Sequence, residues 1–325
     1  MPNSCLDDFD MVDLLMYITI LIFFLIILSA ICTKFITQKI KHSIPKFGKT
    51  TVLEDAEIHW YETGQGRPII MLHGLAGNLR NFTYALSERL DQDYRVIAID
   101  RAGCGWSKRS KPEIATLQEQ ARIIAQFIDK EQIDKPLIVG HSLGGAIALA
   151  LALEYNNKIS GLALICPATQ TVDKVPDIFR FLNISSPFLR FFLAHTLSSL
   201  FGVLTRKDTF EIAFAPEPVS ENFSIRGGGD LALSSNAFIK TSEDLVFALS
   251  SAPLLVGREK ELDVPTKILF GEKDEILDVK LHGEKFAELS GAQIKVLADK
   301  GHMLPLTQPK ECSNFIRSMM DETSI

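Results

Sequence analysis

One serine in the chain has surroundings that favour nucleophilic chemistry. Ser142 stands in the sequence Gly-His-Ser-Leu-Gly, directly after the apolar run Leu137–Val139. Residues 146–153 alternate alanine with isoleucine or leucine and predict a helix. A serine at a tight turn between a strand and a helix has a strained backbone that exposes its hydroxyl above the sheet edge, and flanking glycines avoid collisions there. We therefore predict that Ser142 is a catalytic nucleophile.

A second apolar run could supply the groups that stabilise a developing negative charge. Residues 68–72 predict a central strand buried on both faces, and His73-Gly74 follows directly. In an acyl-transfer enzyme this position forms half of an oxyanion hole. We expect the backbone N–H groups of Leu75 and Leu143 to be its two donors. Taken alone, a His-Gly pair merely ends a strand, so this expectation depends on the serine motif.

A glycine-interrupted loop follows the strand expected at residues 95–99. Residues 100–107 read Asp-Arg-Ala-Gly-Cys-Gly-Trp-Ser and lack the third glycine and following helix of a dinucleotide fingerprint, so we predict a tight turn near the mouth of the site. Cys104 has no base or helix N-terminus placed to activate it. Helices are expected at residues 78–90 and 116–132.

These motifs occur in a recognisable order. His73-Gly74, the 100–107 loop and residues 140–145 resemble the α/β-hydrolase fold superfamily, and the resemblance covers roughly residues 50–320. It implies an α/β fold with a mostly parallel eight-stranded sheet and helices on both faces. It also implies a helical cap inserted after the sixth strand and a catalytic triad in the chain order Ser, Asp, His.

The resemblance indicates where to look for the partners of Ser142. Asp274 follows the apolar strand expected at residues 266–271, and Glu272 and Asp278 are alternatives in the same loop. Of seven histidines, only His302 stands in a glycine-marked loop after a late strand, expected at 294–297. We therefore expect His302 to be the base and Asp274 the acid that orients it. Such a triad requires no metal or organic cofactor.

Composition excludes several other classes of protein. The net charge is -6, and no basic stripe is present, which argues against nucleic-acid binding. The five cysteines show no paired spacing, so neither a disulfide framework nor a zinc site is expected. With 325 residues and 46% hydrophobic content, the chain can bury one large core.

The N-terminal region predicts a membrane anchor. Residues 14–32 carry no charge and would span about 28 Å as a helix, close to the thickness of a bilayer core. Four aspartates precede this run, whereas a secretory signal peptide begins with positive charge and has a shorter apolar core. A run that is apolar on every face also lacks the solvent side of a surface helix. Five lysines follow the run and none precedes it, so the positive-inside rule places the following domain in the cytoplasm.

These observations divide the chain into six segments. We expect a short tail at 1–13, a transmembrane helix at 14–33, a basic juxtamembrane linker at 34–50, a hydrolase core at 51–166 and 266–325, and a cap at 167–265. The cap is rich in aromatic residues, and we expect Phe179, Phe188, Phe191 and Phe192 to contact the substrate. Its apolar helices must bury against protein, an acyl chain or a membrane, and the sequence leaves these three open.

The combination of an anchor, a basic stretch and an apolar cap is similar to single-pass monoacylglycerol lipases with cytosolic catalytic domains. The similarity implies a lipid ester substrate, either a monoacylglycerol, a lysophospholipid or a related long-chain ester. Carbon–carbon bond hydrolases and small-ester carboxylesterases of the same fold remain alternatives. A non-catalytic scaffold is a third, and its mark would be a broken triad. Haloalkane dehalogenases need an aspartate where Ser142 stands.

Overall fold

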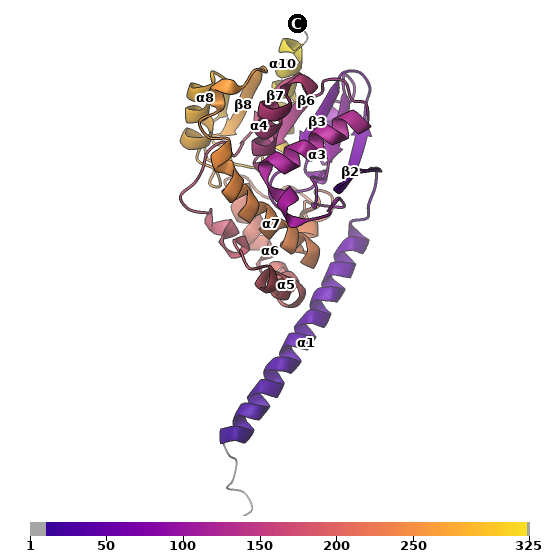
Figure 1. Ribbon diagram of the computed structural model, residues 1–325, viewed down its shortest axis with the longest axis vertical. Helices are drawn as coiled ribbons and strands as arrows, with labels where there is room; N and C mark the ends of the chain where they lie inside the picture. Colours follow the sequence, from indigo (N-terminus) through magenta and orange to yellow (C-terminus); the bar gives the residue numbers. More distant parts are fainter. Residues whose placement is uncertain (1–10, 324–325) are drawn as a thin grey trace, which may run out of the picture.

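A single sheet forms the centre of the protein. The structure is a computed structural model, and it describes residues 11–323. The strands are β1 (Lys49–Val52), β2 (Ala56–Thr63), β3 (Pro68–Leu72), β4 (Arg95–Ile99), β5 (Lys108–Arg109), β6 (Leu137–His141), β7 (Gly161–Ile165), β8 (Thr266–Gly271) and β9 (Gln293–Leu297). Eight of them lie in the order β1-β2-β4-β3-β6-β7-β8-β9, and the short β5 pairs with β2 (Figure 1).

The sheet is mostly parallel, as the α/β-hydrolase resemblance implied. Strands β3, β4, β6, β7, β8 and β9 run parallel, whereas β2 is antiparallel to β1, β4 and β5. The sheet has one strand more than expected because two residues of the loop after β4 pair with β2. The central strands read as unbroken apolar runs because both of their faces are covered. Their carboxyl ends meet at one edge, where Leu72 aligns with Gly140 and Gly271 with Leu297.

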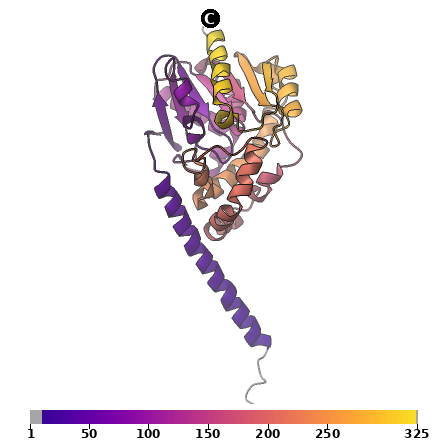
Figure 2. The ribbon, with the colours of Figure 1, turned by 180° about the vertical axis from the view of Figure 1, so that it is seen from behind.

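Helices cover both faces of the sheet. The helices of the core are α2 (Arg80–Thr83), α3 (Leu117–Lys130), α4 (Leu143–Tyr155), α8 (Lys285–Ser290), α9 (Leu304–Thr307) and α10 (Pro309–Glu322). Helices α3 and α4 pack together on one face, and α10 contacts β7 and β8 and lies in front in the view from behind (Figures 1 and 2). The start of α3 is set by Thr116, whose hydroxyl accepts the N–H of Glu119.

The prediction of one helix at residues 78–90 is wrong. The segment forms only α2 and a single 3₁₀ turn at Ser87–Arg89. The buried apolar side chains of this segment are those of Leu79, Phe82, Leu86 and Leu90. They recur every three or four residues, as in a helix, although the backbone forms separate turns. Periodicity reports which side chains face the core, and successive short turns satisfy it as well as one helix does.

The segment between β7 and β8 forms the cap. Its main helices are α5 (Pro187–Thr196), α6 (Ser198–Phe214) and α7 (Ser235–Ser251), and no strand is formed within this described segment. It lies over the carboxyl edge of the sheet (Figure 1). The cap therefore covers the edge at which the predicted catalytic loops end.

A long helix leaves the body at the N-terminal end. Helix α1 (Met11–Ser43) has 33 residues, and within residues 11–323 it is the one unbroken helix long and apolar enough to cross a membrane. It runs past the cap and extends well beyond the body (Figures 1 and 2). The helix continues through residues 34–43, so only the irregular segment 44–48 remains of the expected linker before β1. Most of the expected tail at 1–13 lies outside the described residues.

Candidate active site

Ser142 occupies a sharp turn between β6 and α4. Its backbone has φ 54° and ψ −122°, a conformation that a non-glycine residue adopts only under strain. Its carbonyl accepts the N–H groups of Gly145 and Ala168 at 2.8 and 3.1 Å, which holds the strained turn in place. A Cβ atom at Gly144 would lie 2.1 Å from the carbonyl oxygen of Leu72, so the close approach of helix and strand requires glycine there. The geometry is that of a nucleophile elbow.

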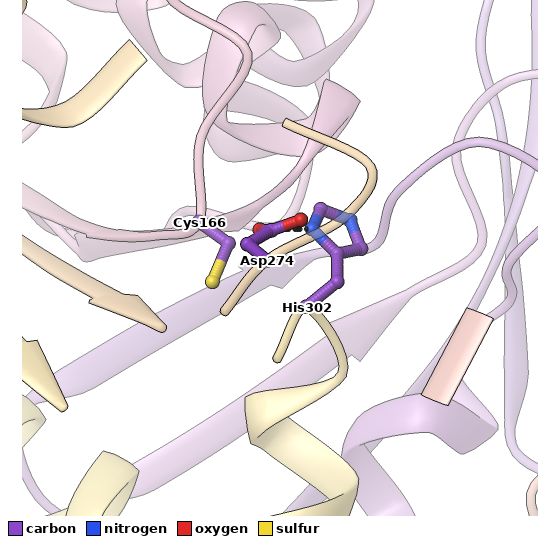
Figure 3. A group of neighbouring side chains, drawn as sticks. All are labelled: Cys166, Asp274 and His302. Carbon is purple, nitrogen blue, oxygen red and sulfur yellow. Dashed lines mark hydrogen bonds and ion pairs between the residues drawn. The ribbon is translucent and has the colours of Figure 1, made fainter. Parts of the chain in front are cut away.

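Asp274 and His302 form a buried pair beside this turn. Nδ1 of His302 lies 2.6 Å from Oδ2 of Asp274, and Figure 3 shows the carboxylate facing the imidazole ring. The other carboxylate oxygen accepts the N–H groups of Ile276 and Leu277, each at 2.9 Å. Burial acts to raise the pKa of Asp274, but the charge and hydrogen bond of His302 and the two N–H donors bring it below its ordinary value. Asp274 is therefore held ionised against His302.

The other two acids of the same loop have different partners. Glu272 accepts the backbone N–H of Asp299, and Asp278 accepts the N–H of Leu281 as the N-cap of a short π-helical turn. Of the three acids that the sequence left open, Asp274 is the one that bonds His302.

Cys166 is the third residue of this cluster. The potential ligand atoms of Cys166, Asp274 and His302 lie within 4.8 Å of one another (Figure 3). Burial raises the pKa of the Cys166 thiol well above its ordinary value, and the thiolate form that binds metals is correspondingly disfavoured. The donor set fits a catalytic pair with a neutral thiol beside it better than a metal centre.

Two cavities meet at Ser142. The first has a volume of about 170 Å³ and is lined by Ser142, His302 and the cap. The second, of about 130 Å³, is lined by Ser142, Leu143 and His282 among others. Leu75, Ser142, Phe179 and Ile276 line both. Ser142 and His302 thus both line the first cavity, but their side chains form no direct hydrogen bond within the described chain. Catalytic hydrogen bonds of this kind often tighten only when substrate is bound.

The loop that carries Leu75 is held by two buried side chains. Burial lowers the pKa of His73 to about 4, so its ring is neutral. Its Nδ1–H then donates to Gly74 O at 2.8 Å, and its Nε2 accepts the N–H of Arg101 at 3.1 Å. The Arg101 guanidinium donates in turn to the carbonyl oxygens of His73 and Gly74. This arrangement fixes the loop beside Ser142, while Leu143 N–H belongs to the first turn of α4, where N–H groups lack intrahelical partners.

Comparison with known proteins assigns the chain to a family. A sequence model described as "alpha/beta hydrolase fold" matches residues 67–309, which is most of the chain. The chain belongs to the alpha/beta hydrolase fold family. It is therefore a hydrolase by family, in agreement with the resemblance carried by its motifs.

Individual members of the family show the range of relatives. The monoacylglycerol lipase abhd6-A of Xenopus laevis is 23% identical over 268 residues, which cover 79% of this chain and 78% of the relative. A putative lipase of Acinetobacter baumannii AYE has a TM-score of 0.65 at 22% identity and covers 90% of this chain and 96% of its own. A meta-cleavage product hydrolase of Pseudomonas fluorescens IP01 has a TM-score of 0.67 at 19% identity, with coverage of 85% and 98%. The two structural similarities show the shared hydrolase fold.

The four aromatic residues expected to contact substrate are placed differently from one another. Phe179 lines both cavities of this hydrolase. Phe188, Phe191 and Phe192 lie on α5 outside both cavities, and their side chains are 79%, 58% and 36% exposed. The first cavity is lined instead by other cap aromatics, which the sequence reasoning missed: Phe181, Phe201, Phe210, Phe214, Phe223 and Phe238. Phe210 and Phe214 are four residues apart on α6, and that spacing was the available signal.

A buried ion cluster joins the cap to the loop after β4. Asp244 of α7 bonds Arg101 at 2.8 Å and Arg109 at 2.5 Å, and all three side chains are buried. Burial acts to raise the pKa of Asp244, but the charges of the two arginines bring it below its ordinary value. The predicted tight turn at 100–107 is thus a docking point for the cap. Cys104 lies in the same turn, where burial raises its pKa to about 12.

Proposed function

We propose that the protein is a membrane-anchored serine hydrolase that cleaves carboxylic esters of lipids, and that its substrates are monoacylglycerols in particular. The observation that carries the proposal is the position of Ser142, which lies where two cavities meet, beside the Asp274–His302 pair. An ester carbonyl placed at Ser142 has one cavity for its acyl chain and another for its alcohol.

The mechanism is that of a Ser-His-Asp triad. His302 removes the proton from Ser142 as its oxygen attacks the ester carbonyl. The N–H groups of Leu75 and Leu143 stabilise the oxyanion of the tetrahedral intermediate. Asp274 keeps the proton of the resting imidazole on Nδ1, which leaves Nε2 free to accept, and it stabilises the imidazolium that forms. The alcohol leaves with the proton held by His302, and water activated by the same histidine releases the fatty acid.

The lining of the cavities favours a neutral lipid ester. Among the described residues, no Asp, Glu, Lys or Arg side chain lines either cavity, and the walls are mainly aliphatic and aromatic. A long acyl chain gains free energy from such a surface, whereas a charged group would be desolvated there without a partner. The monoacylglycerol lipase name of the relative from Xenopus laevis agrees with this substrate class.

Two further features belong to the proposal. Helix α1 would hold the catalytic domain at the bilayer in which such substrates reside. The lysines that follow its apolar run favour the cytoplasmic side for that domain.

A carbon–carbon bond hydrolase is the alternative, and the meta-cleavage product hydrolase of Pseudomonas fluorescens IP01 shares the fold. A small soluble acid as substrate would need a cationic group in the cavity. The uncharged lining therefore favours the ester.

The decisive experiment compares fatty acid release from a long-chain monoacylglycerol and a short-chain ester by the detergent-solubilised full chain. We expect release from both, faster on the long chain. Ser142→Ala should lower kcat by about 10⁶-fold. Ser250→Ala is the matched control, since Ser250 lies on the exposed side of α7 and bonds only the Phe247 carbonyl. Hydrolysis of the short ester alone would overturn the lipid assignment, and unchanged release by Ser142→Ala would overturn the mechanism.

A further inference from the structure

Helix α1 is bound to the cap by a row of hydroxyl groups. Ser29 and Thr33 both donate to the carbonyl oxygen of Thr196, at 2.5 and 2.7 Å. Thr37 accepts the backbone N–H of Ser235 at 3.2 Å. Ser29, Thr33 and Thr37 are four residues apart and therefore share one face of the helix. The corner between α5 and α6 is thus fixed against the anchor.

The outer side of this corner is unusually apolar. Helix α5 and the first half of α6 expose large apolar side chains: Phe188, Phe191, Leu197, Phe201, Val203 and Leu204, with exposed fractions between 40% and 79%. Soluble proteins rarely leave contiguous apolar patches of this kind in water, and such patches mark protein or membrane contacts.

The hydroxyl row sets the depth of this patch relative to a bilayer. Ser29 and Thr33 lie in the last two turns of the apolar run that ends before Lys34. Because both bond Thr196, the end of α5 lies level with the edge of the membrane-spanning segment. Figure 1 shows α5 as the part of the body nearest to the middle of α1. The apolar patch and the apolar surface of α1 are therefore continuous.

The rest of α6 shows that the helix pair does not cross the membrane. Helices α5 and α6 meet at 74°, and Arg206, Lys207 and Asp208 follow directly after the apolar half of α6. Charged side chains of this density belong in water or headgroups. The geometry fits a helix corner that lies in the interface plane.

We propose that α5 and the first half of α6 are inserted in the leaflet at the end of the α1 span. Phe201 is exposed on this surface and also lines the first cavity. The cavity thus lies directly behind the inserted corner. On the proposed function, an acyl chain passes from the leaflet to Ser142 beside Phe201 without crossing bulk water.

The test measures the depth of single residues in the full chain. We would place an environment-sensitive fluorophore at Phe188→Cys or Leu204→Cys in vesicles that contain lipids brominated in their acyl chains. Both positions should be quenched strongly and show blue-shifted emission, as a label at Ile22→Cys in α1 should. A label at Val52→Cys is the matched control, because Val52 is 68% exposed on β1, away from the cap. Quenching at 188 and 204 no stronger than at 52 would overturn the insertion.

Kinetics of the same surface separate insertion from the proposed function. The double variant Phe188→Lys, Leu204→Lys should lower hydrolysis of vesicle-borne monoacylglycerol at least about tenfold and leave hydrolysis of a soluble short ester within about twofold, because neither residue lines a cavity. A double variant that lowers hydrolysis of both substrates by the same factor, or of neither, would contradict delivery through the leaflet. Strong quenching with no monoacylglycerol hydrolysis by the wild type would sustain insertion and defeat the proposed substrate.

A separate cavity between the anchor, the core and the cap carries a second inference. Its volume is about 200 Å³, and its charged lining residues are Lys41 of α1, Lys108 of β5 and Lys240 of α7. No carboxylate lines it among the described residues. Lys108 and Lys240 are each paired with a glutamate at 2.9 Å, whereas Lys41 forms no ion pair within the described chain.

We infer that this cavity binds the phosphate of an anionic phospholipid headgroup. Three ammonium groups line the cavity, and that of Lys41 has no ion-pair partner within the described chain, so a phosphate placed there has cationic donors for its oxygens. Lys41 lies eight residues beyond Thr33 on the same helix, about 12 Å further along its axis, which is within reach of the headgroup layer. The inference is independent of the catalytic assignment.

Thermal unfolding of the detergent-solubilised full chain tests it. A short-chain phosphatidic acid should raise the unfolding midpoint by roughly 5 °C, and the matching neutral diacylglycerol should not. Lys41→Gln with Lys240→Gln should remove the shift. Lys39→Gln, on the exposed side of α1, should keep it. An equal shift with inorganic phosphate would overturn the headgroup as the ligand, and no shift with either anion would overturn the site.

Discussion

The substitution Asp274→Asn tests the catalytic assignment most directly. Oδ1 of Asp274 accepts two N–H groups, those of Ile276 and Leu277, whereas Oδ2 faces His302. In the variant the amide oxygen will stay with the two N–H donors, so the amide NH₂ will face Nδ1 of His302. An NH₂ group donates, and Nδ1 must then accept, which moves the ring proton to Nε2. That nitrogen can no longer take the proton of Ser142.

The size of the effect follows from this wrong tautomer. The same change in a serine protease triad lowers kcat by about 10⁴, which corresponds to about 5.5 kcal/mol of transition-state stabilisation. The side chain of Asp274 is fully buried and keeps both backbone hydrogen bonds as asparagine, so we expect the fold to survive. The loss should therefore appear in kcat at nearly unchanged unfolding midpoint.

The assay is hydrolysis of a soluble short-chain ester by the purified full chain, with the unfolding midpoint measured on the same sample. Asp278→Asn and Glu272→Gln are matched controls, because these acids accept backbone N–H groups, of Leu281 and Asp299, and not the ring of His302. Each should retain activity within a few-fold. The reasoning would be refuted by an Asp274→Asn variant whose kcat lies within tenfold of the wild type. It would also be refuted by a control variant whose kcat falls by 10⁴, which corresponds to about 5.5 kcal/mol.

Three further predictions follow from the site and the cap. Thr209→Phe should lower hydrolysis of long-chain relative to short-chain esters by about tenfold or more, because Thr209 lines the first cavity. Asp244→Asn should lower the free energy of unfolding in urea by about 3–5 kcal/mol, since it breaks a buried ion cluster, whereas Glu261→Gln in an exposed pair should cost at most about 1 kcal/mol. Burial lowers the pKa of His282 to about 4, whereas a histidine in the unfolded chain has a pKa of about 6.5. Between about pH 4 and pH 6.5, therefore, the imidazole of this residue is protonated in the unfolded chain and neutral in the folded one. Stability must therefore fall as pH falls from about 6.5 to about 4, and His282→Asn, which keeps an acceptor near the N–H groups of residues 169 and 170, should flatten that slope by up to about 1.4 kcal/mol per pH unit.

The core of the fold was predictable because its strands are buried on both faces. The strands expected at 68–72, 95–99 and 266–271 coincide with β3, β4 and β8, and the apolar run 137–139 lies in β6. The parallel order brings their carboxyl ends to one edge. Residues that follow such runs must gather at that edge, whatever the rest of the chain does. This is why the chain order implied by the α/β-hydrolase resemblance could indicate which loops meet.

Side-chain direction in the cap was not predictable in the same way. Helix α5 is apolar on nearly every face, so no pattern separates a cavity-facing phenylalanine from a membrane-facing one. Phe188 and Phe191 proved to point outward because α5 is fixed by its contacts with α1 and α7, which lie far away in sequence. The burial of Arg101 and Arg109 was equally unpredictable, because their partner Asp244 lies more than 100 residues away in the sequence.

The cap connects the outer apolar surface to the catalytic loop through continuous contacts. Arg190 of α5 donates to the hydroxyl of Ser242 on α7 at 3.0 Å. Two residues along the same helix, Asp244 bonds Arg101, whose guanidinium also donates to the carbonyl oxygen of Gly74. Gly74 directly precedes Leu75, the predicted oxyanion donor. Because each link is buried and bonded at both ends, α7 cannot shift relative to the core without moving the loop or leaving a charge unpaired. The proposed position of the cap in the interface and the geometry of the loop that carries Leu75 are therefore parts of one arrangement.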